Sequence, residues 1–138
     1  MSAQILLETE LSRVLASSEP IQSAFGTPVR IVSADQTRAA FPFLRFIRHE
    51  FRADARAHDG PAEHRLSLEV FSRAGGRAEA IRLLHLVEET LRTSVLAPEG
   101  LHVVLCHAVY SDVFLQSDQT SFRGLLRLRV LSEAFSNV

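Results

Sequence analysis

The pattern of apolar and polar residues changes its period once, at a glycine pair near the middle of the chain. Leu66, Leu68 and Val70 alternate with polar residues, which is the signature of a half-buried strand. Gly75 and Gly76 end that alternation, and apolar residues then recur at helical spacing. These residues are Ala80, Leu83, Leu84, Val87 and Leu91. The pattern therefore predicts a strand, a tight turn and an amphipathic helix within residues 63–94.

The first sixteen residues also have helical spacing, with Ser2 as the expected N-cap. The apolar stripe of this helix is Leu7, Leu11, Val14 and Leu15. One more helical turn is expected at residues 21–25. Further strands are predicted at 29–32, 43–52, 101–110 with a continuation to 116, and 122–131.

The faces of two of these strands follow from period-two alternation. In residues 43–52, strict alternation places Phe43, Arg45, Ile47, His49 and Phe51 on one face. In the last strand it places the even-numbered residues in the core; these are Gly124, Leu126, Leu128 and Val130. The run 101–110 is almost continuously apolar, which favours a central position in the sheet.

The order of elements is helix, strand, strand, strand, helix, strand, strand, with short links that favour hairpins. We therefore predict an α+β fold: a mainly antiparallel sheet of about four to five strands with two helices packed on one face. The 138 residues fit one domain, residues 1–138, and there is no internal repeat.

Composition excludes several classes of function. The formal net charge is −1 and all fifteen basic residues are arginine, so no global field favours non-specific binding to DNA or to an anionic membrane. No apolar run approaches the ~20 residues of a membrane span, and the N-terminal segment carries acids where a signal peptide would carry basic residues. We expect a protein that is made and kept soluble in a cytoplasm, with no membrane partner.

The candidates for chemistry are weak. His102 and His107 lie five apart on a predicted strand, hence on opposite faces, and cannot share a metal ion. Cys106 is a lone thiol within an apolar strand, which is typical of an inert cysteine. The sequence thus predicts no catalytic residue, no cofactor, no metal site and no enzyme. The alternative is a small enzyme or ligand-binding domain with a polar pocket near His58, His64 and the glycine pair.

Two regions suggest contacts with other proteins. Arg123, Arg127 and Arg129 share the outward face of the last strand, and Phe71 shares a face with polar residues, a composition typical of interfaces. The connection Ala53 to Pro61 is polar and long enough to project from the sheet. Its candidate contact residues are Asp54, Arg56, His58 and Asp59.

Three segments, in order, resemble one known family. They are Ala40-Phe41-Pro42-Phe43-Leu44, the stretch from His64 to Ala80, and Gly124-Leu125-Leu126-Arg127-Leu128-Arg129. This pattern is similar to that of the tail-completion, or tail-terminator, proteins of long-tailed phages and gene transfer agents. Phe43 stands where the family often has Tyr, and Phe71 stands where it often has Trp.

The resemblance implies a structural protein of a virion or gene transfer agent particle, synthesised in a bacterial cytoplasm and located in the tail at the head–tail junction. Such proteins form a ring, commonly hexameric, that ends polymerisation of the tail tube. The implied partners are further copies of the chain, the tail tube protein and the head–tail connector, or stopper, protein. DNA is expected to pass through the lumen without specific binding, in agreement with the absence of a basic excess.

Overall fold

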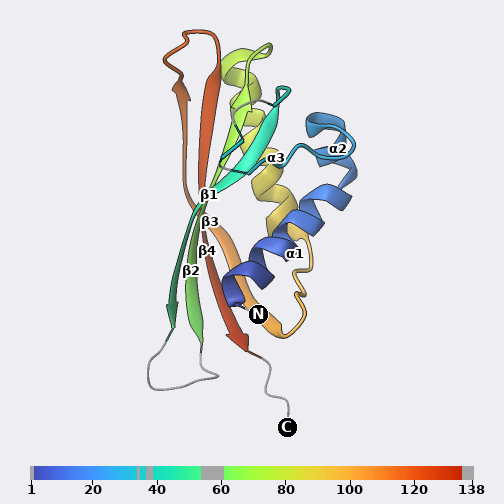
Figure 1. Cartoon of the computed structure of the whole chain (residues 1–138), viewed down its shortest axis with the longest axis vertical. Coiled ribbons are helices and arrows are strands. Elements are labelled where there is room, and N and C mark those ends of the chain that lie inside the picture. The colour runs from blue at the N-terminus through green and yellow to red at the C-terminus, as the bar shows by residue number, and fades with distance from the viewer. Residues whose placement is uncertain (1, 34, 37–38, 54–60, 135–138) are drawn as a thin grey trace.

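The chain forms one antiparallel sheet with a layer of helices on one face, as Figure 1 shows. This computed structural model describes residues 2–33, 35–36, 39–53 and 61–134. The elements are α1 (Ala3–Ser17), α2 (Glu19–Phe25), β1 (Phe43–Ala53), β2 (Ala62–Ser72), α3 (Gly76–Thr93), β3 (Leu101–Leu115) and β4 (Phe122–Ala134). The strand order is β1-β2-β4-β3 and every pair of neighbours is antiparallel. The α+β prediction is confirmed, with four strands and three helices in the described residues.

The helices begin and pack as their sequences predict. In α1, the Ser2 hydroxyl accepts a hydrogen bond from the backbone N–H of Ile5 at 3.2 Å, which caps the helix. The predicted apolar stripes of α1 and α3 are both buried. Gly76 has φ of +66°, a left-handed conformation that favours glycine, so the glycine pair permits the turn from β2 into α3. Of the helices in the described part of the chain, none is long and apolar enough to cross a bilayer.

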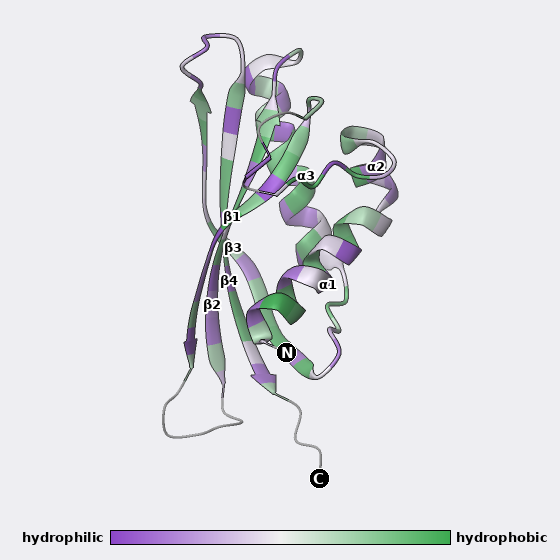
Figure 2. Ribbon diagram, viewed as in Figure 1, coloured by the Kyte–Doolittle hydropathy of each residue, from purple (hydrophilic) through white to green (hydrophobic). Residues whose placement is uncertain are grey.

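The core lies between the sheet and the helices. Leu126, Leu128 and Val130 of β4 are at most 2% exposed, which confirms their predicted face. At Gly124 the fit is close, because an added Cβ would lie 2.7 Å from Val70 Cγ2 and 2.8 Å from Leu84 Cγ. Figure 2 shows apolar and polar residues alternating along the strands, as expected of a sheet covered on one side.

The predicted faces of β1 are wrong beyond Phe46. The register passes from Phe46 opposite Leu68 to Arg48 opposite Ser67, so Ile47 is an extra residue in a β-bulge. After the bulge, His49 lies on the helix side and Arg48 on the other. Strict alternation cannot anticipate an inserted residue, and one insertion reverses every later side chain.

Two other predictions are corrected. The predicted strand at 29–32 forms only an isolated bridge, in which Ile31 lies parallel to Leu44. β3 is an edge strand rather than a central one, and β4, rich in arginine, lies between β2 and β3. The apolar content of a strand did not predict its position in the sheet. The central strand β4 carries its arginines on the uncovered face, while the edge strand β3 leaves Val104 and Val109 more than half exposed.

We predict that replacing Leu128 with Ala lowers the free energy of unfolding by about 2–5 kcal/mol, as large-to-small changes in a core do. Leu105→Ala is the matched control, because Leu105 is 37% exposed on the edge strand β3. The Leu105→Ala substitution should lower the free energy of unfolding by less than about 1 kcal/mol. Urea denaturation measures both variants, and equal costs would contradict the assignment of faces.

Candidate interaction surface

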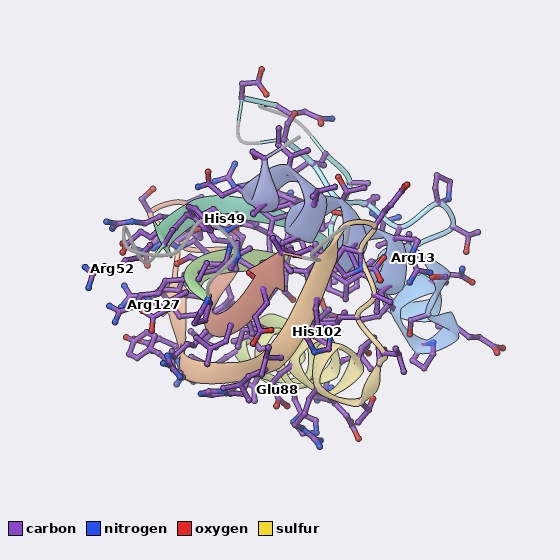
Figure 3. All side chains as sticks on the ribbon, turned by 90° about the horizontal axis from the view of Figure 1, so that it is seen from below. Arg13, His49, Arg52, Glu88, His102 and Arg127 are labelled. Carbon is purple, nitrogen blue, oxygen red and sulfur yellow. The ribbon has the colours of Figure 1, made fainter. Side chains whose placement is uncertain are left out.

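The helices leave one face of the sheet uncovered, and this open face carries rows of charged side chains. Registers of the four strands place seven arginines and five carboxylates on it, a net charge of +2. The arginines are Arg45, Arg48, Arg52, Arg65, Arg123, Arg127 and Arg129, and the carboxylates are Glu50, Glu63, Glu69, Asp112 and Glu133. Because the whole chain has a net charge of −1, the rest of it carries −3. Figure 3 shows Arg52 and Arg127 together on one side of the molecule and Arg13 of α1 on the other.

One half of the open face is packed against itself around Glu69. This carboxylate is only 2% exposed, yet it receives Arg45 Nε at 3.0 Å and Arg123 Nη1 at 3.0 Å. A buried charge is tolerated only when it is paired in this way. Arg45 also lies over the Phe71 ring, 4.8 Å from its centroid, and Phe71 stacks on Phe43 with centroids 4.6 Å apart.

Phe71 is therefore 5% exposed and covered by its own chain, unlike the surface position that the sequence suggested. Its face is as predicted, since Phe71 pairs with Arg123 across the strands. Its role is to support Arg45, which in turn neutralises Glu69.

The other half of the open face contains a hollow of about 410 Å³ that Ser67 lines together with the arginines on either side of it. Arg48, Ser67, Arg127 and Tyr110 follow one another across the strands in a single row. The next row contains Glu50, Arg65, Arg129 and His107. Ser67 is the smallest side chain in either row, so the hollow forms between the arginines that flank it.

Two glutamates neutralise part of this charge. Glu63 receives Arg65 Nε and Arg129 Nε, each at 2.9 Å, and Arg48 Nη2 lies 2.7 Å from Glu50 Oε1. The hydrogen bonds from Arg129 and then Arg65 hold the pKa of Glu63 below its ordinary value, so this carboxylate stays ionised. The Arg127 guanidinium lies over the Tyr110 ring, 4.8 Å from the centroid.

The sequence-predicted interface residues thus have different positions. Arg123, Arg127 and Arg129 are all on the open face, but Arg123 is bound to the buried Glu69 whereas Arg127 lines the hollow. The other four candidates, Asp54, Arg56, His58 and Asp59, lie outside the described residues.

A series of hydrogen-bonded polar side chains lies beneath α1, and the sequence patterns did not predict it. Glu8 Oε2 lies 2.7 Å from His49 Nδ1, His49 Nε2 lies 2.7 Å from His64 Nδ1, and His64 Nε2 lies 2.8 Å from Ser132 Oγ. This series joins α1 to β1, β2 and β4. It was missed because strict alternation places His49 on the wrong face; the bulge at Ile47 brings it beside His64.

Burial, and secondly the neighbouring charge of His49, lower the pKa of His64 to about 4. With both rings neutral, each group donates toward the carboxylate: Ser132 to His64, His64 to His49 and His49 to Glu8. A proton added to His64 occupies the ring nitrogen that accepts from Ser132, so that hydrogen bond must reverse. His64 and Ser132 have no exposed surface, so no substrate reaches them.

The alternative pocket near His64 and the glycine pair does not form from described residues. His64 and Ser72 stand at opposite ends of β2, roughly 27 Å apart at the rise of an extended strand. At the turn itself, the Ser72 hydroxyl donates to the Glu79 carboxylate, and a Cβ on Gly75 would collide with Glu79. A carboxylate therefore occupies the N-terminal end of α3, where an anion would have to bind.

The remaining candidates for chemistry are also placed. Because Val104 is inserted in β3, His102 pairs with Glu133 and His107 with Arg129, so both histidines lie on the open face rather than on opposite faces. Their partners are still four positions apart along β4, which is roughly 13 Å. Among the described residues, no group of three or more histidine, cysteine or acidic side chains could hold a metal ion. Burial raises the pKa of the Cys106 thiol to about 11, which disfavours a reactive thiolate.

Comparison with known proteins gives a consistent picture. The family model described as "Tail completion protein gp17" matches residues 9–133. A chain from the virion of a native gene transfer agent particle has a TM-score of 0.79 at 17% identity, covering 97% of this chain and 100% of that one. The gp17 protein of bacteriophage SPP1 has a TM-score of 0.63 at 19% identity, covering 98% of this chain and 92% of that one. No curated protein sequence matches the chain.

We predict that stability falls as the pH falls from 6.5 to 4. The pKa of His64 is lower in the folded chain, about 4, than its ordinary value of 6.5, so the unfolded chain binds more protons in this window. The free energy of unfolding should fall by about 3 kcal/mol across this window. Urea midpoints at several pH values measure it. His64→Gln should be less stable at pH 7 but lose less on acidification, while His85→Gln, 71% exposed, should behave as the parent. Equal acid losses in the parent and His64→Gln would refute this assignment.

The structure also separates two arginines that the sequence grouped together. Arg123→Ala leaves the buried Glu69 with one guanidinium, so we expect a loss of about 1–3 kcal/mol. Arg127→Ala removes an exposed group and should cost less than about 1 kcal/mol. Thermal melting of the two variants measures the difference, and the reverse order would be inconsistent with the pairing around Glu69.

Proposed function

The chain belongs to the tail completion protein gp17 family, whose members are structural tail proteins and not enzymes, and we propose that it forms the ring that ends the tail tube. The protein is thus a component of the tail of a phage or gene transfer agent particle. In the proposal, copies of the chain close a hexameric ring at the head-proximal end of the tube. The ring stops tube polymerisation and joins the tail to the head connector.

The observation that carries this proposal is the difference between the two sides of the molecule. One side is a layer of helices with six carboxylates and four arginines, a net charge of −2, and the other is an open sheet face with a net charge of +2. A ring is built from heterologous contacts, in which one surface of each copy meets a different surface of the next. Two unlike surfaces of opposite charge meet that requirement, and they favour association between copies in one orientation.

The charge of the chain suits a passage for DNA. The formal net charge of −1 gives no overall attraction for phosphates. A ring of such chains lets a polyanion slide, because few counterions are released on contact. The connection Ala53 to Pro61, with Asp54, Arg56, His58 and Asp59, is proposed as the element that meets the tail tube protein or the connector protein.

Electron microscopy of assembled particles tests the function. A small tag placed after Val138 should appear at the head–tail junction, once per subunit around the tail axis. Particles that lack the chain should contain heads and tails that are not joined, with tubes of irregular length. A tag found along the tube or at the distal tip would exclude the proposed role.

A further inference from the structure

We propose that the hollow around Ser67 binds a carboxylate side chain from a second copy of this chain. The inference rests on the proposed ring and names the contact that would hold neighbouring copies together. It stands on three observations: an unused donor in the wall of the hollow, an excess of guanidinium groups around it, and the opposite charge of the helix layer.

The unused donor is the Ser67 hydroxyl. Ser67 is only 8% exposed, and its hydroxyl makes no hydrogen bond to any described residue. Among the described residues, no completely enclosed side-chain oxygen or nitrogen lacks a partner. The Ser67 oxygen therefore reaches the wall of the hollow that this residue lines. A hydroxyl held in this position is ready to donate to an incoming oxygen atom.

The hollow has more positive than negative charge. Arg48, Arg65, Arg127 and Arg129 line it, against Glu50 at its rim and Glu63, which pairs with two of the arginines. The difference is two positive charges. Arg127 has no ion pair with a described carboxylate; its guanidinium is instead held over Tyr110. A guanidinium fixed by stacking keeps its planar fork available for the two oxygens of a carboxylate.

The rim favours a protein side chain over a nucleic-acid phosphate. Glu50, which lines the hollow, and Glu63, which pairs with two of its arginines, repel the many phosphates of a polyanion, whereas a single carboxylate brings one negative charge to the two excess positive charges. Within the lining of the hollow, the bulged Val109 is 56% exposed and Tyr110 is 43% exposed. These apolar surfaces suit the stem of a glutamate or an apolar neighbour in the same segment.

A second copy supplies the opposite charge. The layer of helices α1, α2 and α3 has six acidic residues and four arginines. Glu19 of α2, Glu89 of α3 and Glu99 after α3 are exposed and lie outside the sheet. A heterologous contact between this side and the open face of the next copy would bring a carboxylate to Arg127, and repetition of that contact closes a ring.

The first test compares two charge reversals by sedimentation and native mass spectrometry of the full chain. Arg127→Glu should weaken self-association by roughly 100-fold, the scale expected for a reversed contact in an interface. Arg73→Glu is the matched control, because Arg73 is 54% exposed in the turn between β2 and α3, away from both the hollow and the helix layer. Ser67→Val, which enlarges a side chain in the wall of the hollow without changing charge, should also weaken association. Circular dichroism shows whether each variant is folded.

The second test asks for rescue. Arg127→Glu is combined in turn with Glu19→Arg, Glu89→Arg and Glu99→Arg, and the combination that restores the parent's oligomer identifies the inserted carboxylate. Each arginine variant alone, with Arg127 intact, should associate less well when its residue is the partner.

Four outcomes would overturn the inference. Association of Arg127→Glu equal to that of the parent would show that the hollow is not used. A parent chain that stays monomeric at millimolar concentration, or a lack of rescue by any reversal, would remove the second copy as its occupant. Binding of short duplex DNA that Arg127→Glu abolishes would assign the hollow to phosphate. The position of the tagged chain in particles is independent of all four, so the ring contact and the proposed function can fail separately.

Discussion

The extra residue in β1 determines what both faces of the sheet carry. With Ile47 inserted, His49 lies beneath α1 and Arg48 lies beside Ser67. Without the insertion the two would exchange faces, placing a guanidinium under the helices and an imidazole on the open face. The series of polar side chains beneath α1 and the arginine-lined hollow both depend on this one bulge. Bulges commonly re-aim side chains in this way at sheet edges, and β1 is an edge strand.

The open face is more than a solvated surface with unpaired charges. Glu69 organises one half of it, because its buried carboxylate requires both Arg45 and Arg123 and these in turn lie over Phe71 and Phe114. The charged groups of that half are paired with one another, so few of them are available to a partner protein. The half around Ser67 is different, since its guanidinium groups exceed the carboxylates that face them. The difference between the two halves comes from side-chain size. Ser67 is small and leaves a hollow in its half, whereas the larger Glu69 and Phe71 fill the other half.

Sequence patterns predicted what depends on burial alone. The stripes of α1 and α3 and the core face of β4 repeat without interruption, so period and burial agree at Leu11, Leu84 and Leu128. Predictions failed where the backbone departs from its period, as at Ile47 and Val104, and where neighbours decide exposure. Phe71 looks like a surface residue in sequence, but only the cross-strand position of Phe43 shows that its ring is covered. The position of β3 at the edge could not be predicted either, because an apolar strand can be central in the sheet or can lie at its edge with apolar residues exposed.

The two edges of the sheet favour assembly through its faces. On β1, Arg30 and Val32 bond the backbone of Leu44 and the Gln4 amide donates to the His49 carbonyl at 2.9 Å. On β3, bulges at Val104 and Val109 interrupt the ladder, and the Asp112 carboxylate and Arg77 bond the N–H and carbonyl of Val113. Covered, bulged and side-chain-capped edges resist pairing with further strands. Because strand addition at an edge can continue without limit, blocked edges direct association to the faces. When a contact between two unlike faces is repeated, the copies form a closed ring if the rotation between neighbours is a whole-number fraction of a full turn. A ring with a fixed number of copies requires such a contact.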